Sequence, residues 1–182
     1  MQYLKNYLNK IIARGNEKLA ESISHTAEEV GEKYIKNFSF TSHEIGLLFG
    51  NVQSGKTGQM FGIISKATDL GFPVFVLLTT DNVVLQQQTL DRVKADLDGY
   101  CICGENDSGI FTDNSLLQPT IIVLKKNVRI LKLWANIFNS TGFMRGNPLF
   151  IIDDEADAAS LNTLLNKDRQ SSINKYLDII KN

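Results

Sequence analysis

An eight-residue motif constrains this chain more than any other feature. Residues 50–57 read GNVQSGKT, a complete G-x-x-x-x-G-K-T pattern, directly after the apolar run GLLF. The residues that follow have apolar positions at helical spacing, so the motif lies between a predicted strand and a predicted helix. Its glycines let the backbone curl so that successive N–H groups bind phosphate oxygens. The sequence therefore predicts a phosphate-binding loop, since a plain glycine turn leaves Lys56 and Thr57 unexplained.

The residues of this loop have distinct expected roles. The Lys56 ammonium group would place its charge on the β and γ phosphates, and the Thr57 hydroxyl is a ligand for Mg²⁺. The helix expected to begin at Thr57 adds the positive end of its dipole. The predicted nucleotide-binding residues are Gly50, Asn51, Val52, Gln53, Ser54, Gly55, Lys56, Thr57 and Gly58.

A second motif, LFIIDDEAD at residues 149–157, follows about 100 residues later. Its apolar part predicts a buried strand, and its acids emerge where ligands bind in open α/β sheets, beyond the carboxyl ends of the strands. Alone, such acids also suit a helix N-terminus. Asp153 and Asp154 each qualify as the first acid of the pair. We favour Asp154 for Mg²⁺ and Glu155 for orienting the attacking water, because the longer Glu side chain reaches the γ-phosphate side.

Short apolar runs alternate with helical stretches after residue 42. The predicted strands cover residues 45–49, 74–79, 100–103, 120–124 and 149–153, and the predicted helices 57–70, 82–97, 127–139 and 171–180. Strands that are nearly all apolar, such as VFVLL, favour a parallel sheet covered on both faces. The pattern predicts a three-layer α/β lobe with a mostly parallel sheet. The polar segment 104–119 is expected to be a mobile loop.

The first 40 residues lack this alternation and predict helices instead. Two apolar stripes at helical spacing, separated by Gly15 and Asn16, indicate an N-terminal helical segment at 1–40. Residues 41–182 would then form the nucleotide-binding lobe.

The composition of the chain limits its expected cellular location and its partners. The 182 residues carry 19 Lys+Arg and 20 Asp+Glu, a net charge of −1, so no global field attracts nucleic acid or membrane. No apolar run approaches the roughly 18 residues of a membrane span, and the N-terminus has no signal-peptide pattern. We expect a cytoplasmic protein with no membrane partner. Cys101 and Cys103 lack the further ligands of a zinc site, which favours reduced, partly buried thiols.

Together, GNVQSGKT and IIDDEAD resemble the first RecA-like lobe of superfamily-two helicases and translocases. The form VQSGKT, with DDEAD followed by ASLNT at 159–163, is similar to a narrower group. This group comprises bacterial helicase-like ATPases that precede a so-called Z-one domain in restriction, DNA-repair and phage-defence gene clusters. The resemblance covers about residues 45–163.

The resemblance implies an ATPase that uses ATP and Mg²⁺ and acts on nucleic acid, DNA rather than RNA. Lys56 and Glu155 match the catalytic positions, and Thr57 and Asp154 match the metal-binding positions. Thr80 lies where such lobes touch the nucleic-acid backbone, and Lys125 and Lys126 lie at the next such motif. The family continues with a second lobe that supplies arginine fingers, and any nuclease module would lie beyond Asn182. On this basis the chain is expected to be one piece of a larger machine, of unknown oligomeric state.

Local charge is consistent with these contacts. Residues 114–152 contain five bases and no acid, beginning with Lys125 and Lys126. We predict that both lysines contact phosphates, although a solvated helix face is an equally ordinary explanation. Trp134 is expected in the core, with base stacking as the alternative.

Two other functions are alternatives to this interpretation. A nucleotide-gated switch without translocation would share the phosphate loop, but the Asn-Lys-x-Asp of guanine-specific GTPases is absent at a strand end. A small-molecule kinase would have Arg-rich lid motifs after the loop, and the sequence shows none. Poor hydrolysis by the fragment alone is expected, because an arginine finger contributes about 10³–10⁵ in rate.

Overall fold

The computed structural model describes residues 2–39, 44–46, 48, 55–115, 117–141 and 146–154. The chain divides into two compact units. Unit 1 comprises Met1–Phe72 and Val93–Gly99, and unit 2 comprises Pro73–Arg92 and the residues from Tyr100 on. None of the helices described is long and apolar enough to cross a membrane.

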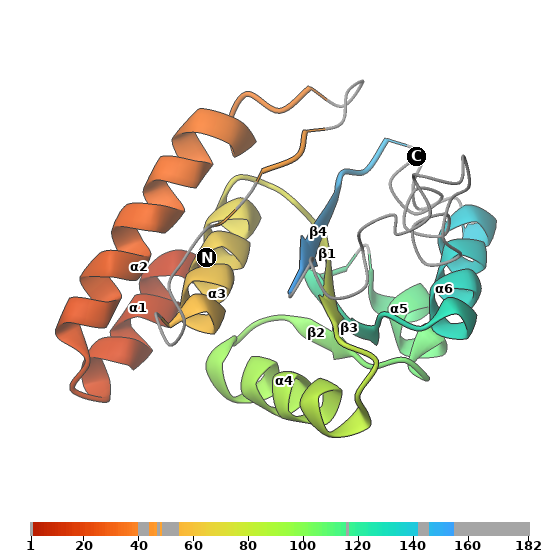
Figure 1. Cartoon of the computed structure of the whole chain (residues 1–182). Coiled ribbons are helices and arrows are strands. Elements are labelled where there is room, and N and C mark those ends of the chain that lie inside the picture. The colour runs from red at the N-terminus through yellow and green to blue at the C-terminus, as the bar shows by residue number, and fades with distance from the viewer. Residues whose placement is uncertain are drawn as a thin grey trace, which may run out of the picture. The chain divides into compact units, whose positions relative to one another are not determined.

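Unit 1 is helical. It contains α1 (Tyr3–Ala13), α2 (Glu17–Val30), a π-helical segment (Gly31–Ile35) and α3 (Lys56–Asp69), and α2 runs beside α3 (Figure 1). Glycines permit this close approach, because a Cβ atom on Gly62 would collide with Cγ2 of Ile23. Ile23 is fully buried, and Tyr7 packs edge-on against Phe61. The N-terminal helices therefore form one core with α3.

An aspartate links the C-terminal end of α3 to the N-terminal end of α1. The Asp69 carboxylate accepts hydrogen bonds from the backbone N–H groups of Tyr3 (2.8 Å) and Leu4 (3.1 Å), which begin α1. This carboxylate satisfies donors that have no partner inside the helix. After α3, Gly71 takes φ 97°, and the N–H of Phe72 donates to the Ala67 carbonyl. This is the Schellman ending that the glycine permits.

Unit 2 is built on a parallel sheet. Its strands are β1 (Val74–Thr79), β2 (Cys101–Cys103), β3 (Thr120–Lys125) and β4 (Leu149–Asp153), in the order β2-β3-β1-β4. All three pairings are parallel, with Leu78 opposite both Leu124 and Asp153. The prediction of an α/β fold with a parallel sheet is confirmed.

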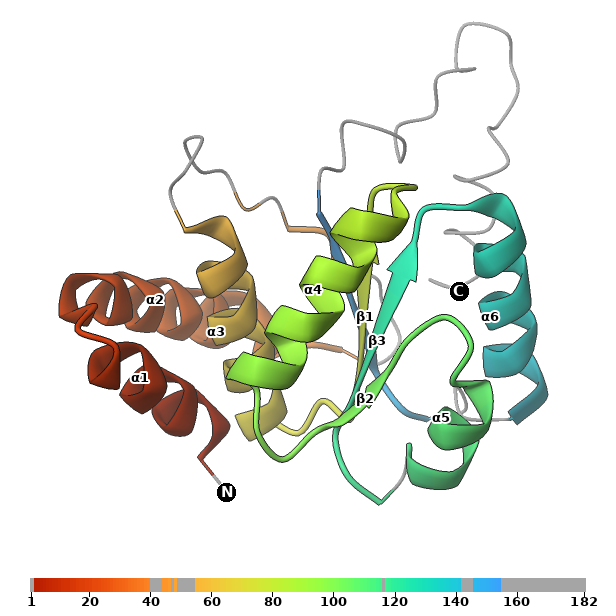
Figure 2. The same cartoon turned by 90° about the horizontal axis from the view of Figure 1, so that it is seen from below.

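Two helices cover one face of this sheet, α5 (Ser108–Asn114) and α6 (Val128–Thr141), and both lie on the same side of the strands (Figure 2). Alternate residues of β1, β3 and β4 pack against them, and Trp134 of α6 is fully buried there. Its indole N–H donates to the Glu105 carbonyl at 3.1 Å. The prediction that Trp134 belongs to the core is confirmed.

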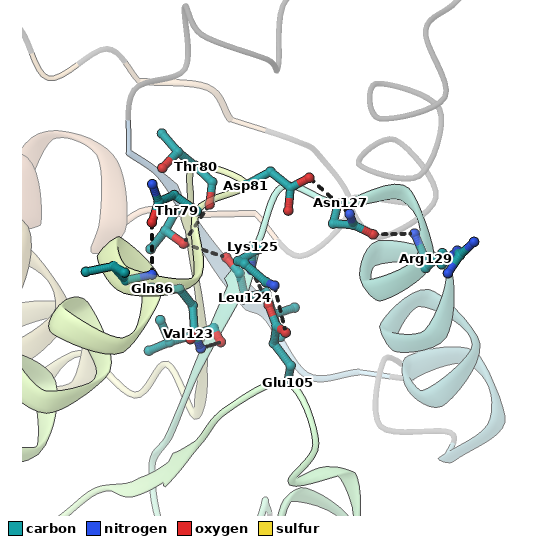
Figure 3. A network of polar contacts seen from close by, with 12 residues as sticks. Thr79, Thr80, Asp81, Gln86, Glu105, Val123, Leu124, Lys125, Asn127 and Arg129 are labelled. Carbon is teal, nitrogen blue, oxygen red and sulfur yellow. Dashed lines mark hydrogen bonds and ion pairs between the residues drawn. The ribbon is translucent and has the colours of Figure 1, made fainter.

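Side chains complete the edge of β3 where β2 ends. The last pairing of β2 is Cys103 with Ile122, so the Val123 carbonyl and the Lys125 N–H lie beyond it. Gln86 of α4 (Val83–Asp96) donates to the Val123 carbonyl at 3.3 Å, and the Glu105 carboxylate accepts from the Lys125 N–H at 3.0 Å (Figure 3). Both backbone groups are thereby satisfied without a strand partner.

The structure corrects two predictions. Ile45, Gly46 and Leu48 are not in a strand, and Ile45 is 89% exposed, so the strand predicted at 45–49 is wrong at these residues. The segment predicted as a mobile loop contains α5, whose Phe111 is fully buried. The helix predicted at 171–180 lies outside the described residues, and the domain boundary predicted at residue 40 stays a prediction.

Candidate functional site

The phosphate-loop motif is described from Gly55 onward, while Gly50, Asn51, Val52, Gln53 and Ser54 lie outside the described residues. Gly55 takes φ 74°, a left-handed conformation that glycine adopts at no steric cost. Helix α3 begins directly after it, at Lys56, one residue earlier than predicted. The Gln59 N–H makes the first bond of the helix, to the Gly55 carbonyl at 3.1 Å. The first turn of α3 therefore starts at the lysine of the motif, directly after Gly55.

The side chains of this first turn differ in exposure. Lys56 is exposed, while Thr57 and Gly58 are half-buried. A Cβ atom on Gly58 would lie 3.1 Å from Cδ1 of Ile23, and one on Gly55 would lie 3.1 Å from Cδ1 of Leu19. Gly58, assigned from sequence to the nucleotide, thus also has a packing reason to be glycine.

The acidic motif lies at the carboxyl end of β4 in unit 2. The strand ends at Asp153, and Asp154 begins the following turn with its N–H bonded to the Leu78 carbonyl at 3.0 Å. Because β1, β3 and β4 are parallel, their carboxyl ends bring Thr80, Lys126, Asp153 and Asp154 to one edge of the sheet. Glu155 lies outside the described residues.

Lys126 is the only charged side chain among the buried residues that the structure describes. Its side chain is 0% exposed, and its Nζ lies 2.9 Å from Oδ1 of Asp153. The same Nζ donates to the backbone carbonyl of Asp154 at 2.8 Å. An ammonium group bound in this way is unavailable to a phosphate, so the structure gives Lys126 a different role from the predicted nucleic-acid contact.

The other two predicted nucleic-acid contacts, Thr80 and Lys125, are only partly accessible. The Lys125 side chain is 17% exposed, and its Nζ lies 3.6 Å from Oε2 of Glu105. The Thr80 hydroxyl is buried and has no hydrogen-bond partner among the described residues. Contact of these two residues with nucleic acid stays a prediction.

Sequence reasoning missed a polar network at this edge (Figure 3). Asn127 accepts from the Arg129 N–H at 3.0 Å, which caps α6, and donates to the Asp81 carboxylate at 3.0 Å. Asn82 caps α4 by accepting from the N–H groups of Val84 and Leu85. An Asn directly before an apolar helical pattern is the signal that could have found both caps.

The described residues offer few side chains that could bind a metal ion. In the described part of the chain, no three or more His, Cys, Asp or Glu side chains gather as a metal site. A Mg²⁺ ion held with nucleotide phosphates needs only one or two protein carboxylates, however. The Asp154 carboxylate fits this requirement, because no described residue bonds to it.

The two cysteines form a separate buried pair on β2. Their Sγ atoms lie 3.9 Å apart, and both thiols are free, as predicted. Burial, followed by the neighbouring Cys101, raises the pKa of the Cys103 thiol to about 12. A thiol of this kind is a weak nucleophile at neutral pH, because the thiolate is the reactive form.

Known proteins add no identification. No family model, no curated protein and no solved structure matches this chain.

Proposed function

We propose that this chain is the ATP-binding, RecA-like lobe of an ATP-hydrolysing, nucleic-acid-dependent helicase-like translocase of a bacterial restriction, repair or defence system. One observation carries the proposal: the G-x-x-x-x-G-K-T motif leads through a left-handed Gly55 into a helix that begins at its lysine. The parallel sheet, with acids at the carboxyl end of β4, is consistent with a three-layer lobe of this type.

Each residue has a stated task in this proposal. Lys56 holds the β and γ phosphates, and the N–H groups at the start of α3 bind phosphate oxygens. Thr57 and Asp154 would hold Mg²⁺, which neutralises charge on the phosphates when bound. Glu155 orients the attacking water. Asp154 is preferred to Asp153 for the metal in this assignment, since Lys126 binds one oxygen of the Asp153 carboxylate.

The test is ATP hydrolysis by the full-length gene product, with and without DNA or RNA. We expect DNA to stimulate hydrolysis and the Glu155→Gln variant to lose that stimulation. Glu21→Gln, an exposed change on α2, is the matched control. Hydrolysis indifferent to nucleic acid would favour a nucleotide-gated switch, and no hydrolysis in the presence of Mg²⁺ would refute the proposal.

A further inference from the structure

We infer that Lys126 is a positioning residue of the nucleotide site, which fixes the backbone of Asp154 and occupies the carboxylate of Asp153. The inference rests on the proposed function. It assigns a task to a buried charge that neither the phosphate loop nor the acidic motif accounts for.

The Lys126 side chain reaches from the end of β3 to the end of β4. Lys126 follows β3, Asp153 ends β4, and β1 lies between these two strands. Neighbouring strands lie about 4.8 Å apart, so the lysine spans two strand spacings across the end of β1. Its N–H is held by the Thr79 carbonyl at 2.9 Å. Lys126 therefore links the end of β3 to β1 through its backbone N–H and to β4 through its ammonium group.

The Lys126 ammonium group binds a backbone carbonyl as well as a carboxylate. A purely structural ion pair needs only the carboxylate of Asp153. Lys126 also donates to the carbonyl of Asp154, at 2.8 Å, and this carbonyl belongs to the peptide that leads into Glu155. The N–H of Asp154 donates to the backbone carbonyl of Leu78 on β1. Both backbone polar groups of Asp154 are thus fixed, while its carboxylate accepts no hydrogen bond from the residues described.

Lys126 also brings a positive charge to the acidic motif. The motif places four acids within five residues, at 153–157, and like charges at such spacing repel one another. Lys126 offsets the charge of Asp153, the first of them. A site with one carboxylate neutralised and the next held by its backbone is preorganised for a cation at Asp154.

The test measures nucleotide binding, so it does not depend on turnover. A fluorescent, non-hydrolysable ATP analogue is titrated onto the full-length protein at increasing Mg²⁺ concentrations. The variants are Lys126→Met, Lys126→Met with Asp153→Asn, and the control Lys132→Met, which removes an exposed charge from α6. The double variant matters most, because it removes both charges together and leaves no unpaired buried ion.

We expect the single Lys126→Met variant to melt at a lower temperature and the double variant to recover most of that loss. Both should need about 10- to 100-fold more Mg²⁺ for half-maximal nucleotide binding, the usual effect of losing a group that orients a metal ligand. Lys132→Met should match the wild type. If the single variant does not fold, the double variant decides alone.

A double variant with the wild-type Mg²⁺ requirement would overturn the inference and leave Lys126 a structural residue. Failure of the proposed function looks different. In that case the wild type binds no analogue, or Lys56→Ala binds it equally well, and the inference fails with it.

Discussion

Gly62 of α3 leaves no room for a side chain, because a Cβ atom there would overlap Cγ2 of Ile23 on α2. Ile23 is fully buried, and its branched side chain has little rotamer freedom in a helix. The contact therefore fixes how closely α2 and α3 approach within unit 1.

The Gly62→Ala variant should lose stability, since overpacking of a core typically costs about 1–3 kcal/mol. The measurement is the urea midpoint followed by circular dichroism. Gly109→Ala on α5 is the control, because its Cβ meets no atom within 4 Å. Alanine should be neutral or slightly stabilising there. Equal midpoints for the two variants would contradict the packing argument.

Lys56→Ala should abolish most nucleotide affinity and leave the melting temperature without nucleotide unchanged, because the Lys56 side chain is exposed. Lys66→Ala, on the same helix, should lower the melting temperature and leave nucleotide affinity unchanged. The Lys66 ammonium group lies 2.5 Å from the Glu28 carboxylate, and its side chain is only 14% exposed. Thermal melts and analogue binding on both variants check this contrast. A large loss of melting temperature in Lys56→Ala would show that this lysine supports the fold instead.

The Thr80→Val variant tests whether the Thr80 hydroxyl contacts nucleic acid or is only a buried polar group without a partner among the described residues. An unmade hydrogen bond of this kind costs about 1–3 kcal/mol. The variant should therefore keep or raise the melting temperature. Thr79→Val is the control and should lower it, because the Thr79 hydroxyl donates to the Leu124 carbonyl. Weaker DNA binding by Thr80→Val, measured by fluorescence anisotropy, would support the predicted nucleic-acid contact.

Stability should fall at alkaline pH because of Cys103. Its pKa is raised to about 12 in the fold, mainly by burial, against about 8.5 for an unfolded thiol. The unfolded chain therefore loses this proton first as pH rises, and the contribution of the buried thiol is lost between about pH 8.5 and 12. The slope from this group is at most about 1.4 kcal/mol per pH unit. Urea midpoints from pH 7.5 to 9.5 should fall less steeply in Cys103→Ala.

Much of unit 2 could be predicted from sequence. The strands at 74–79 and 149–153 coincide with β1 and β4, because fully apolar runs bounded by polar residues identify buried parallel strands well. Helix α5 was missed because its Asn, Asp, Ser and Gly residues are typical of loops, while Phe111 alone supplies its burial. At 45–49 the apolar run alone favoured a strand, and the exposure of Ile45 contradicts it.

The site was predictable only where local motifs define it. The glycine and lysine pattern predicted the start of α3 at Thr57, one residue after its start at Lys56. The burial of Lys126 could not be predicted, because its partner Asp153 lies 27 residues away and on a strand that is not its neighbour. A lysine after an apolar strand ordinarily reaches solvent, and only the tertiary structure brings it to a carboxylate.

The two side chains that complete the edge of β3 also protect it. A free strand edge is a template for pairing with another chain, and many proteins blunt it with charges or proline. Here Gln86 and Glu105 already occupy the Val123 carbonyl and the Lys125 N–H. Both backbone groups lack these hydrogen-bond partners until α4 and the turn after β2 have packed against β3. The partly folded chain, rather than the native one, is therefore the form exposed to strand exchange and aggregation at this edge.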